Sequence, residues 1–170
     1  MQCQLHQIAL SIDWKNQEFN SNLNLLRSDL IKYRQTFSSS AQSSLSTSYS
    51  FHMDVVVSLE KIIPSEFLRN EYITPFGYTT DLYFETDLLG AALQPQDLQA
   101  MTKAYVPLPD NGRQRYVLEV DGKTHFLRNS EEYTGPSRLK SRHLEKFGYN
   151  VIQVCWTIRT VHNPTICSIM

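Results

Sequence analysis

The stretch YVLEVDGKTHF (residues 116–126) carries four polar side chains at alternate positions, namely Glu119, Asp121, Lys123 and His125. In an extended strand, residues i and i+2 point to the same face, so the pattern predicts that these side chains project together. Leu118 and Val120 are expected to pack on the opposite face. Two carboxylates, an ammonium and an imidazole on one face of a strand have the composition of a catalytic or binding site.

The carboxylates of this stretch predict a candidate metal centre. Asp81, in an earlier predicted strand, would join Glu119 and Asp121 as oxygen ligands for a hard divalent cation such as Mg²⁺ or Mn²⁺. Lys123 would then stabilise the charge that develops in a phosphodiester displacement. Under this interpretation, Asp81, Glu119, Asp121 and Lys123 are the catalytic residues of a metal-dependent nuclease.

The same carboxylates also fit a structural role, in which they pair with Arg138, Lys140 or Arg142 of a following helix. The catalytic and the structural interpretation both remain open at this level. Gly122 permits a bend that would end the strand and turn Lys123 away from the shared face.

Charge is distributed unevenly, although the 170-residue chain has a net charge of only −1. Residues 113–146 carry eight Lys or Arg against five Asp or Glu, whereas residues 1–112 carry seven against twelve. A local excess of basic charge on an otherwise acidic chain is typical of a surface that faces a polyanion such as a phosphate backbone. The hydrophobic share of 41% is ordinary for a globular protein with a buried core.

The cysteine and hydropathy patterns argue against several classes of protein. Cys3, Cys155 and Cys167 are too few and too scattered for a disulfide framework and include no Cys-x-x-Cys pair, which favours a reducing compartment. No apolar run approaches the roughly 18 residues of a membrane span, so no membrane partner is expected. The N-terminus shows no transit peptide, so either the chain is not targeted from this end or it is a fragment that lacks its targeting segment.

The chain divides into a helical segment, a linker and a longer α/β unit. Leu23, Leu26 and Leu30 recur at helical spacing within residues 1–35. Residues 36–50 contain eight serines and no charged residue, a composition typical of a linker. The N-terminal helix is therefore expected to belong to a different unit from the residues that follow.

Beyond the linker, hydrophobic periodicity and turn residues predict an α/β domain over residues 51–156. The expected elements are a helix at 51–63, strands at 67–72 and 78–84, a helix at 95–104, a strand from 116, a helix after Thr134 and a strand at 151–156. Pro136 and Gly148 mark the start and the end of the last helix. His143 lies on its apolar stripe and is expected in the core, and His125 is expected to be a hydrogen-bonded structural residue. The last two strands, joined by a helix, are predicted to be parallel neighbours.

Four segments together resemble the RAP domain, which is named for RNA binding and for its abundance in apicomplexan proteins. They are FHMDVVVSLEKI, PFGYTTDLYFE, YVLEVDGKTHFLRN and TGPSRLKSRHLEKFGYNVIQV, within the range from Phe51 to Trp156. The resemblance implies a small α/β fold of the restriction-endonuclease-like PD-(D/E)xK type, similar to Vsr-like nucleases, with a mixed sheet and flanking helices. It also implies organellar RNA metabolism, because the same domain ends the Fas-activated serine/threonine kinase family of mitochondrial proteins and occurs in proteins that act on plastid RNA.

In that resemblance, Asp81 matches the lone aspartate of the nuclease core, and Glu119 matches the carboxylate of the (D/E)xK signature. Asp121 stands where the catalytic lysine belongs, and this departure weakens a nuclease function. Lys123 occupies a position that is commonly proline in the family, although it could restore a basic group nearby. The aromatic-rich stretch that usually follows the last strand is absent, so residues 157–170 are interpreted as a divergent or truncated tail.

The resemblance favours an RNA-binding protein of mitochondrial or plastid RNA processing, RNA stability or ribosomal RNA maturation. The residues expected to bind RNA are Arg115, Lys123, Arg138, Lys140 and Arg142. One alternative is an endoribonuclease with Mg²⁺ or Mn²⁺ at the acidic residues, and a second is a protein-interaction module of an RNA-processing complex. Residues 1–35 would be the remnant of the helical repeats that precede the RAP domain in the family. The expected partners are RNA and other organellar RNA-processing proteins, with the mitochondrion as the first expected location.

Overall fold

The computed structural model describes residue 11 and residues 48–98 and 108–155. Most of the predicted N-terminal helix, most of the serine-rich segment and the tail at residues 157–170 lie outside the described residues. The described elements are α3 (Ser48–Glu60), η1 (Ser65–Phe67), β1 (Arg69–Ile73), β2 (Thr79–Asp87), β3 (Ala92–Leu93), β4 (Arg113–Asp121), η2 (Lys123–His125), α4 (Gly135–Lys146) and β5 (Asn150–Cys155). This order confirms the predicted α/β class. None of the described helices combines the length and the apolar character that crossing a bilayer requires.

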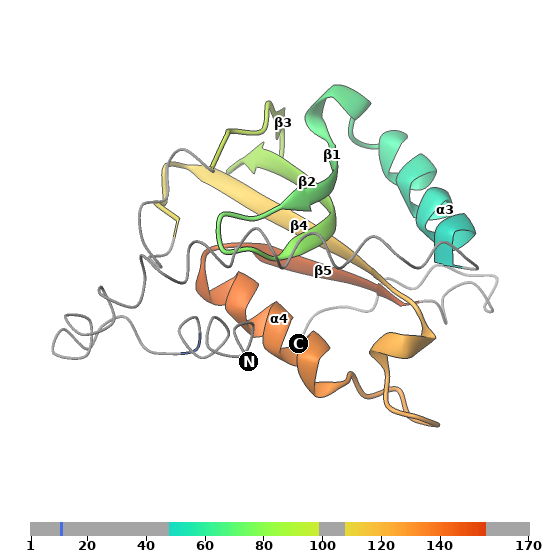
Figure 1. The fold of residues 1–170 in the computed structure, drawn as a ribbon. Helices are drawn as coiled ribbons and strands as arrows, with labels where there is room; N and C mark the ends of the chain where they lie inside the picture. The colour runs from blue at the N-terminus through green and yellow to red at the C-terminus, as the bar shows by residue number, and fades with distance from the viewer. Residues whose placement is uncertain (1–10, 12–47, 99–107, 156–170) are drawn as a thin grey trace, which may run out of the picture.

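The described strands form one mixed five-stranded sheet in the order β1-β2-β4-β5, with β3 paired to β2 (Figure 1). β1, β2 and β4 are antiparallel neighbours, whereas β4 and β5 run parallel, as predicted from the helix that joins them. In the register of the sheet, Leu118 of β4 lies between Leu82 of β2 and Ile152 of β5. β4 is therefore flanked on both sides, so its side chains can meet residues from two neighbouring strands.

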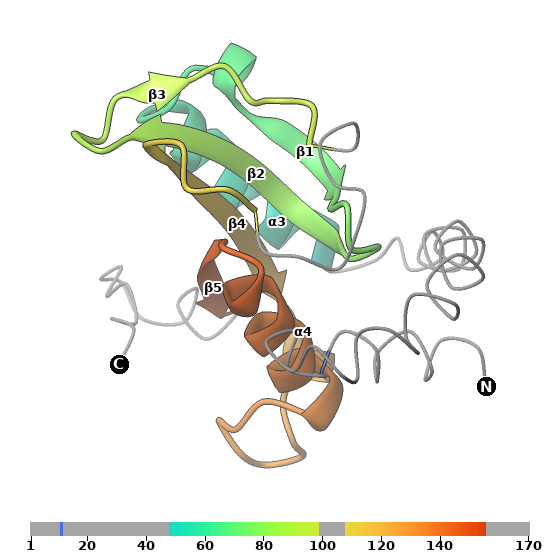
Figure 2. The ribbon, with the colours of Figure 1, turned by 90° about the vertical axis from the view of Figure 1, so that its left-hand side faces the viewer.

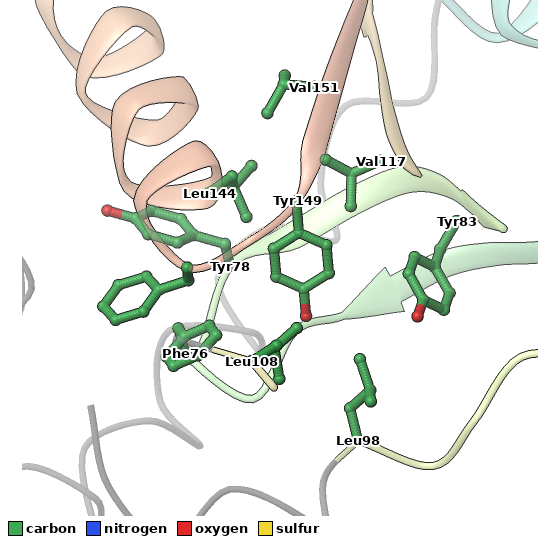
Figure 3. Packing of buried hydrophobic residues seen from close by; sticks show 10 residues of the cluster. Phe76, Tyr78, Tyr83, Leu98, Leu108, Val117, Leu144, Tyr149 and Val151 are labelled. Atoms are coloured by element: carbon green, nitrogen blue, oxygen red, sulfur yellow. The ribbon is translucent and has the colours of Figure 1, made fainter. Parts of the chain in front are cut away.

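The two long helices pack on opposite faces of the sheet (Figure 2). On one face, Val117 of β4 packs in a cluster with Leu144 of α4 (Figure 3). On the other face, Leu118 and Leu82 pack with Val56 of α3. Because successive side chains of a strand alternate between faces, the odd-numbered residues of β4 lie on the α4 side.

The limits of α4 agree with the residues that predicted them. Thr134 is the N-cap residue in an extended conformation, and Pro136 lies in the first turn. Gly148 has a φ of +91°, a left-handed conformation that favours glycine, and its amide donates to Glu145 O at 3.0 Å. His143 is buried with 3% of its surface exposed, which confirms its predicted place in the core.

Several elements differ from the sequence-based expectations. Residues 95–98, the described part of the predicted helix at 95–104, are not helical, and the short strand β3 precedes them. β4 begins at Arg113 and ends at Asp121, after which residues 123–125 form a 3-10 turn. The prediction that four polar side chains share one strand face is therefore wrong for Lys123 and His125. These two residues leave the strand because residues 123–125 form the 3-10 turn, whereas Gly122 itself keeps an extended conformation.

Candidate nucleic-acid interface

Three carboxylates gather at the end of the sheet where β4 continues beyond its pairing with β2. Asp81 of β2 and the β4 residues Glu119 and Asp121 occupy alternate positions on the α4 side of their strands. The Oδ2 atom of Asp81 accepts the backbone N–H of Val120 at 2.6 Å, which holds this carboxylate against β4. We call Asp81, Glu119 and Asp121 the acidic cluster; strand register brings its members together.

Glu119 is buried, with 6% of its surface exposed, and forms an ion pair with Lys140 of α4. This contact is one of the structural pairings that the sequence had left open. Burial raises the pKa of Glu119 to about 7; Lys140 opposes the rise, and the charges of Asp81 and Asp121 add to it. The Oε1 atom of Glu119 is buried and has no hydrogen-bond partner among the described residues.

Asp121 is also buried, at 2% exposure, and faces the turn that follows β4. The Nδ1 atom of His125 lies 3.0 Å from Asp121 Oδ1 and 3.3 Å from Ser137 Oγ in the first turn of α4. Burial raises the pKa of the Asp121 carboxyl, whereas His125, Tyr133 and Lys140 lower it. His125 is thus hydrogen-bonded within the fold, as expected.

The acidic cluster is not a preformed metal centre. In the described part of the chain, no group of three or more His, Cys, Asp or Glu side chains is arranged to hold a metal ion. Each carboxylate has a protein partner instead, as described above. Glu119 Oε1 and Asp121 Oδ2 are buried without a hydrogen bond in these ranges, so they are the oxygens best placed to accept a cation. The metal-binding role of Asp81, Glu119 and Asp121 stays a prediction.

The positive charge at the acidic cluster comes from α4. Lys140 reaches Glu119 from the second turn of the helix, whereas Lys123 lies exposed in the 3-10 turn. Asp121 occupies the strand position that resembles the lysine of a (D/E)xK signature. The ammonium group beside Glu119 comes from α4, and Lys123 does not have the strand position that its predicted catalytic role required.

Arg115 lies inside the protein, which argues against its predicted role in RNA binding. Only 3% of its surface is exposed, because its odd-numbered position on β4 turns it toward the α4 face. Its Nη1 and Nη2 atoms donate to Pro109 O at 3.0 Å and to Asn111 Oδ1 at 2.9 Å. Arg115 therefore fastens the segment before β4 to the sheet.

The remaining cations that were predicted to bind RNA lie on or near α4. Arg138 and Arg142 are exposed and one helical turn apart, and Lys123 is exposed in the turn that follows β4. The Nη2 atom of Arg138 donates to Glu132 Oε2 at 3.3 Å, in an exposed contact. Lys140 is 25% exposed and is held by Glu119. We call Lys123, Arg138 and Arg142 the basic surface.

Sequence reasoning missed a third buried carboxylate, Glu85, at the other end of β2. Glu85 is fully buried and accepts hydrogen bonds from Tyr83 Oη at 2.5 Å, Gln96 N at 2.9 Å and Arg113 Nη1 at 2.6 Å. Glu85 lies two residues after Tyr83 and four after Asp81, so strand alternation places all three on the same face of β2. This alternation is the sequence pattern from which a buried position for Glu85 could have been predicted. Glu85 anchors the segment between β3 and β4, and its three donors mark it as structural.

His143 also has a polar environment that its apolar neighbours in the sequence did not predict. Its Nδ1 atom lies 2.7 Å from the hydroxyl of Tyr78, and its Nε2 atom lies 2.8 Å from the hydroxyl of Ser11. Burial raises the pKa of Tyr78 above its ordinary value, so this hydroxyl stays protonated. The histidine is therefore a hydrogen-bonded core residue rather than part of the acidic cluster.

Comparison with known proteins agrees with the resemblance found in the sequence. Residues 118–158 match the family model of the RAP domain. The chain contains a RAP domain. FAST kinase domain-containing protein 3, mitochondrial, of Bos taurus is 28% identical over 115 residues, which cover 66% of this chain and 16% of that protein. The Homo sapiens protein of the same name is 30% identical over 82 residues, or 48% of this chain and 11% of that protein. The chain thus spans less than a fifth of the length of these relatives.

The RAP domain match covers the end of β4, the turn, α4 and β5. It includes Glu119, Asp121, Lys140 and the basic surface, whereas Asp81 lies before it. The relatives are named as mitochondrial proteins, which supports the mitochondrial location that the resemblance implied. No solved structure matches the chain significantly. The described residues form a mixed sheet with flanking helices, and the restriction-endonuclease-like fold stays a prediction.

Proposed function

We propose that this RAP domain binds RNA in mitochondria through the basic surface, and that it serves in RNA processing, RNA stability or ribosomal RNA maturation. The observation that supports the proposal best is the separation of charge around α4. Glu119 and Asp121 are buried and paired inside the fold, whereas Lys123, Arg138 and Arg142 are exposed. The two carboxylates of β4 are therefore withdrawn from the surface on which these three cations lie.

Contacts with phosphates supply most of the sequence-independent affinity of a protein for RNA. Guanidinium groups suit this role because they are permanently charged and can donate two parallel hydrogen bonds to a phosphate. Arg138 and Arg142 are separated by one helical turn of α4. Lys123 lies in the 3-10 helix η2, and His125 of the same element contacts Ser137 in the first turn of α4. In the proposal, these three cations contact the phosphates of one strand of RNA.

The proposal is tested by exchanging Arg138 and Arg142 for Ala and measuring RNA affinity by fluorescence anisotropy across a salt titration. Each lost phosphate contact should reduce the slope of log K against log salt by about 0.7 for a single strand, so the double variant should lose about 1.4. The matched control exchanges Lys61 and Arg69 for Ala, which removes the same charge from exposed positions before and within the edge strand β1. Equal slopes for wild type and the Arg138/Arg142 variant would rule out this surface.

A metal-dependent endoribonuclease is the second candidate, because two buried carboxylate oxygens lack a hydrogen bond. A buried acceptor without a donor costs free energy, and a divalent cation at Glu119 Oε1 and Asp121 Oδ2 would recover it. Lys140 would then provide the ammonium group beside the carboxylates. This arrangement supports Mg²⁺ or Mn²⁺ binding without the direct participation of Lys123.

The two candidates are separated by incubating RNA with purified wild type, Glu119→Gln and Glu131→Ala in Mg²⁺ or Mn²⁺. Glu131 is an exposed acid near α4 and serves as the control for general loss of negative charge. Metal-dependent cleavage by wild type and Glu131→Ala, lost in Glu119→Gln, would establish the enzyme. If all three proteins bind RNA in a salt-dependent way and none cleaves it, the RNA-binding proposal is supported and the nuclease function is ruled out. Calorimetric titration with Mn²⁺ reports binding independently of activity.

A further inference from the structure

The segment between η2 and α4 folds back on itself as a short finger, which we define as residues 126–133. Phe126 and Tyr133 form an antiparallel β-bridge at its base, and Leu127 N donates to Glu132 O at 2.8 Å. At its tip, Ser130 N donates to Leu127 O at 3.1 Å, and Asn129 has a φ of +58°. The finger extends beyond the sheet at the end of β4, next to the start of α4 (Figures 1 and 2).

The base of the finger holds two aromatic rings side by side. The ring centroids of Phe126 and Tyr133 are 4.5 Å apart with an interplanar angle of 33°, and both residues are partly exposed. The hydroxyl of Tyr133 lies 3.0 Å from Cys155 Sγ, and Thr134 N donates to His125 O at 2.8 Å, so β5 and η2 both hold the finger in place. Neither ring belongs to the three hydrophobic clusters of the described residues. The pair is therefore fixed in position without being part of the core.

Exposed cations lie on the finger and next to it, and the finger also carries the exposed acids Glu131 and Glu132. Lys123 lies three residues before Phe126, and Arg128 lies at the tip of the finger. Arg138 of α4 reaches the finger through its contact with Glu132. A ligand that suits this combination must have a planar apolar face and a negative charge beside it. A nucleotide has both, because its base can stack on an aromatic ring while its phosphate meets Lys or Arg.

We propose that the pair of Phe126 and Tyr133 stacks an unpaired base of single-stranded RNA, while Lys123, Arg128 and Arg138 hold the neighbouring phosphates. This proposal rests on the RNA-binding function proposed above and adds a base-contacting site to it. The ligand is single-stranded because the faces of bases inside a duplex are covered by their neighbours, whereas a free base can turn onto a ring. Stacking is tolerant of sequence, since every base has an aromatic face.

The alternative to stacking is that the two rings only hold the finger together, as aromatic cross-strand pairs do. Phe126→Leu separates the two roles, because leucine keeps an apolar side chain against Tyr133 but has no aromatic face. Phe126→Trp is the matched variant that keeps the aromatic face. Both variants retain every charge of the basic surface.

The experiment compares the full chain and these variants in anisotropy titrations with two oligomers of equal length and charge. One is a single-stranded RNA of ordinary bases, and the other is its abasic counterpart. Phe126→Leu should weaken binding to the RNA about tenfold, with no change for the abasic oligomer and an unchanged salt slope. Phe126→Trp should bind the RNA as tightly as wild type.

If Phe126→Leu loses the same affinity for both oligomers, or loses affinity for neither, the stacking site is ruled out. The proposed RNA-binding function is then still decided by the salt titration of the Arg138/Arg142 variant. If wild type binds neither oligomer, the proposed function fails and the stacking site fails with it. If Phe126→Leu does not fold, RNA that carries the fluorescent base 2-aminopurine tests the wild-type protein directly. Quenching of this base on binding supports stacking, and unchanged emission from a bound complex at every labelled position contradicts it.

Discussion

Lys140 of α4 pairs with Glu119 of β4, and through this contact the helix that carries Arg138 and Arg142 is joined to the strand that carries Glu119 and Asp121. Arg138 and Arg142 lie on the same helix and point outward. The location of the basic surface over the end of the sheet therefore depends in part on one buried ion pair.

Lys140→Met should lower the free energy of unfolding by roughly 3 kcal/mol at alkaline pH, because Glu119 stays buried after its cation is lost. Urea unfolding followed by circular dichroism measures this change. The double variant Glu119→Gln/Lys140→Met should recover most of the loss, since it leaves no buried charge at this position. A Lys140→Met protein as stable as wild type would show that the pair does not fasten α4.

The pKa of about 7 at Glu119 predicts how stability depends on pH. A carboxyl whose pKa is higher in the folded than in the unfolded state binds its proton more tightly when folded, so its stabilising contribution is complete below its unfolded pKa, near 4.5. That contribution is lost as the pH rises through about 7. Wild type should therefore lose about 3 kcal/mol relative to Glu119→Gln between about pH 5 and about pH 8. Urea unfolding at intervals of pH tests this, and parallel curves for the two proteins would contradict it.

Exchange for Ala should lower stability at Arg115 and RNA affinity at Arg142. Arg115→Ala removes two partly buried hydrogen bonds of a buried guanidinium and should cost roughly 2–3 kcal/mol of stability, with no change in the RNA affinity of the folded protein. Arg142→Ala should change stability by less than about 0.5 kcal/mol and weaken RNA binding. Thermal unfolding and anisotropy on the same samples give both quantities. Weakened binding by folded Arg115→Ala would contradict the assignment of this arginine to the interior.

Gly148→Ala should lower stability by about 1–2 kcal/mol because residue 148 has a positive φ, which is costly for residues with a Cβ atom. Space is not the limit, since an added Cβ would lie 3.7 Å from Leu108 O, an ordinary contact distance. Gly135→Ala at the start of the same helix is the control, because that glycine has no positive φ and nothing within 4 Å. Equal melting temperatures for the two variants would show that the left-handed turn after α4 carries no such cost.

Periodicity and turn residues predicted much of this fold, and they also predicted part of the site. The alternation of β4 correctly placed Glu119 and Asp121 on one face, and Thr134, Pro136 and Gly148 correctly bounded the last helix. The choice of a cation partner for Glu119 was not predictable. It depends on how α4 is rotated on the sheet, and a sequence pattern does not determine that rotation.

The errors have physical reasons of the same kind. Lys123 was assigned to the strand face because strand periodicity was extended across Gly122, where the backbone enters a 3-10 turn. Arg115 was assigned to the surface by its charge, but the segment before β4 covers it and provides hydrogen-bond acceptors for its guanidinium. Tertiary packing, which neither composition nor spacing records, decides both positions.

The hydrogen bond from Val120 N to Asp81 Oδ2 makes one backbone proton a reporter for the site. The paired register of β2 and β4 stops at Leu82 and Leu118, so a side chain, rather than a strand carbonyl, protects this amide from solvent. A cation or substrate group that draws the Asp81 carboxylate away would leave the amide open to deuterium exchange. The exchange rate of Val120 would then record the occupancy of the acidic cluster, whether or not a chemical reaction takes place there.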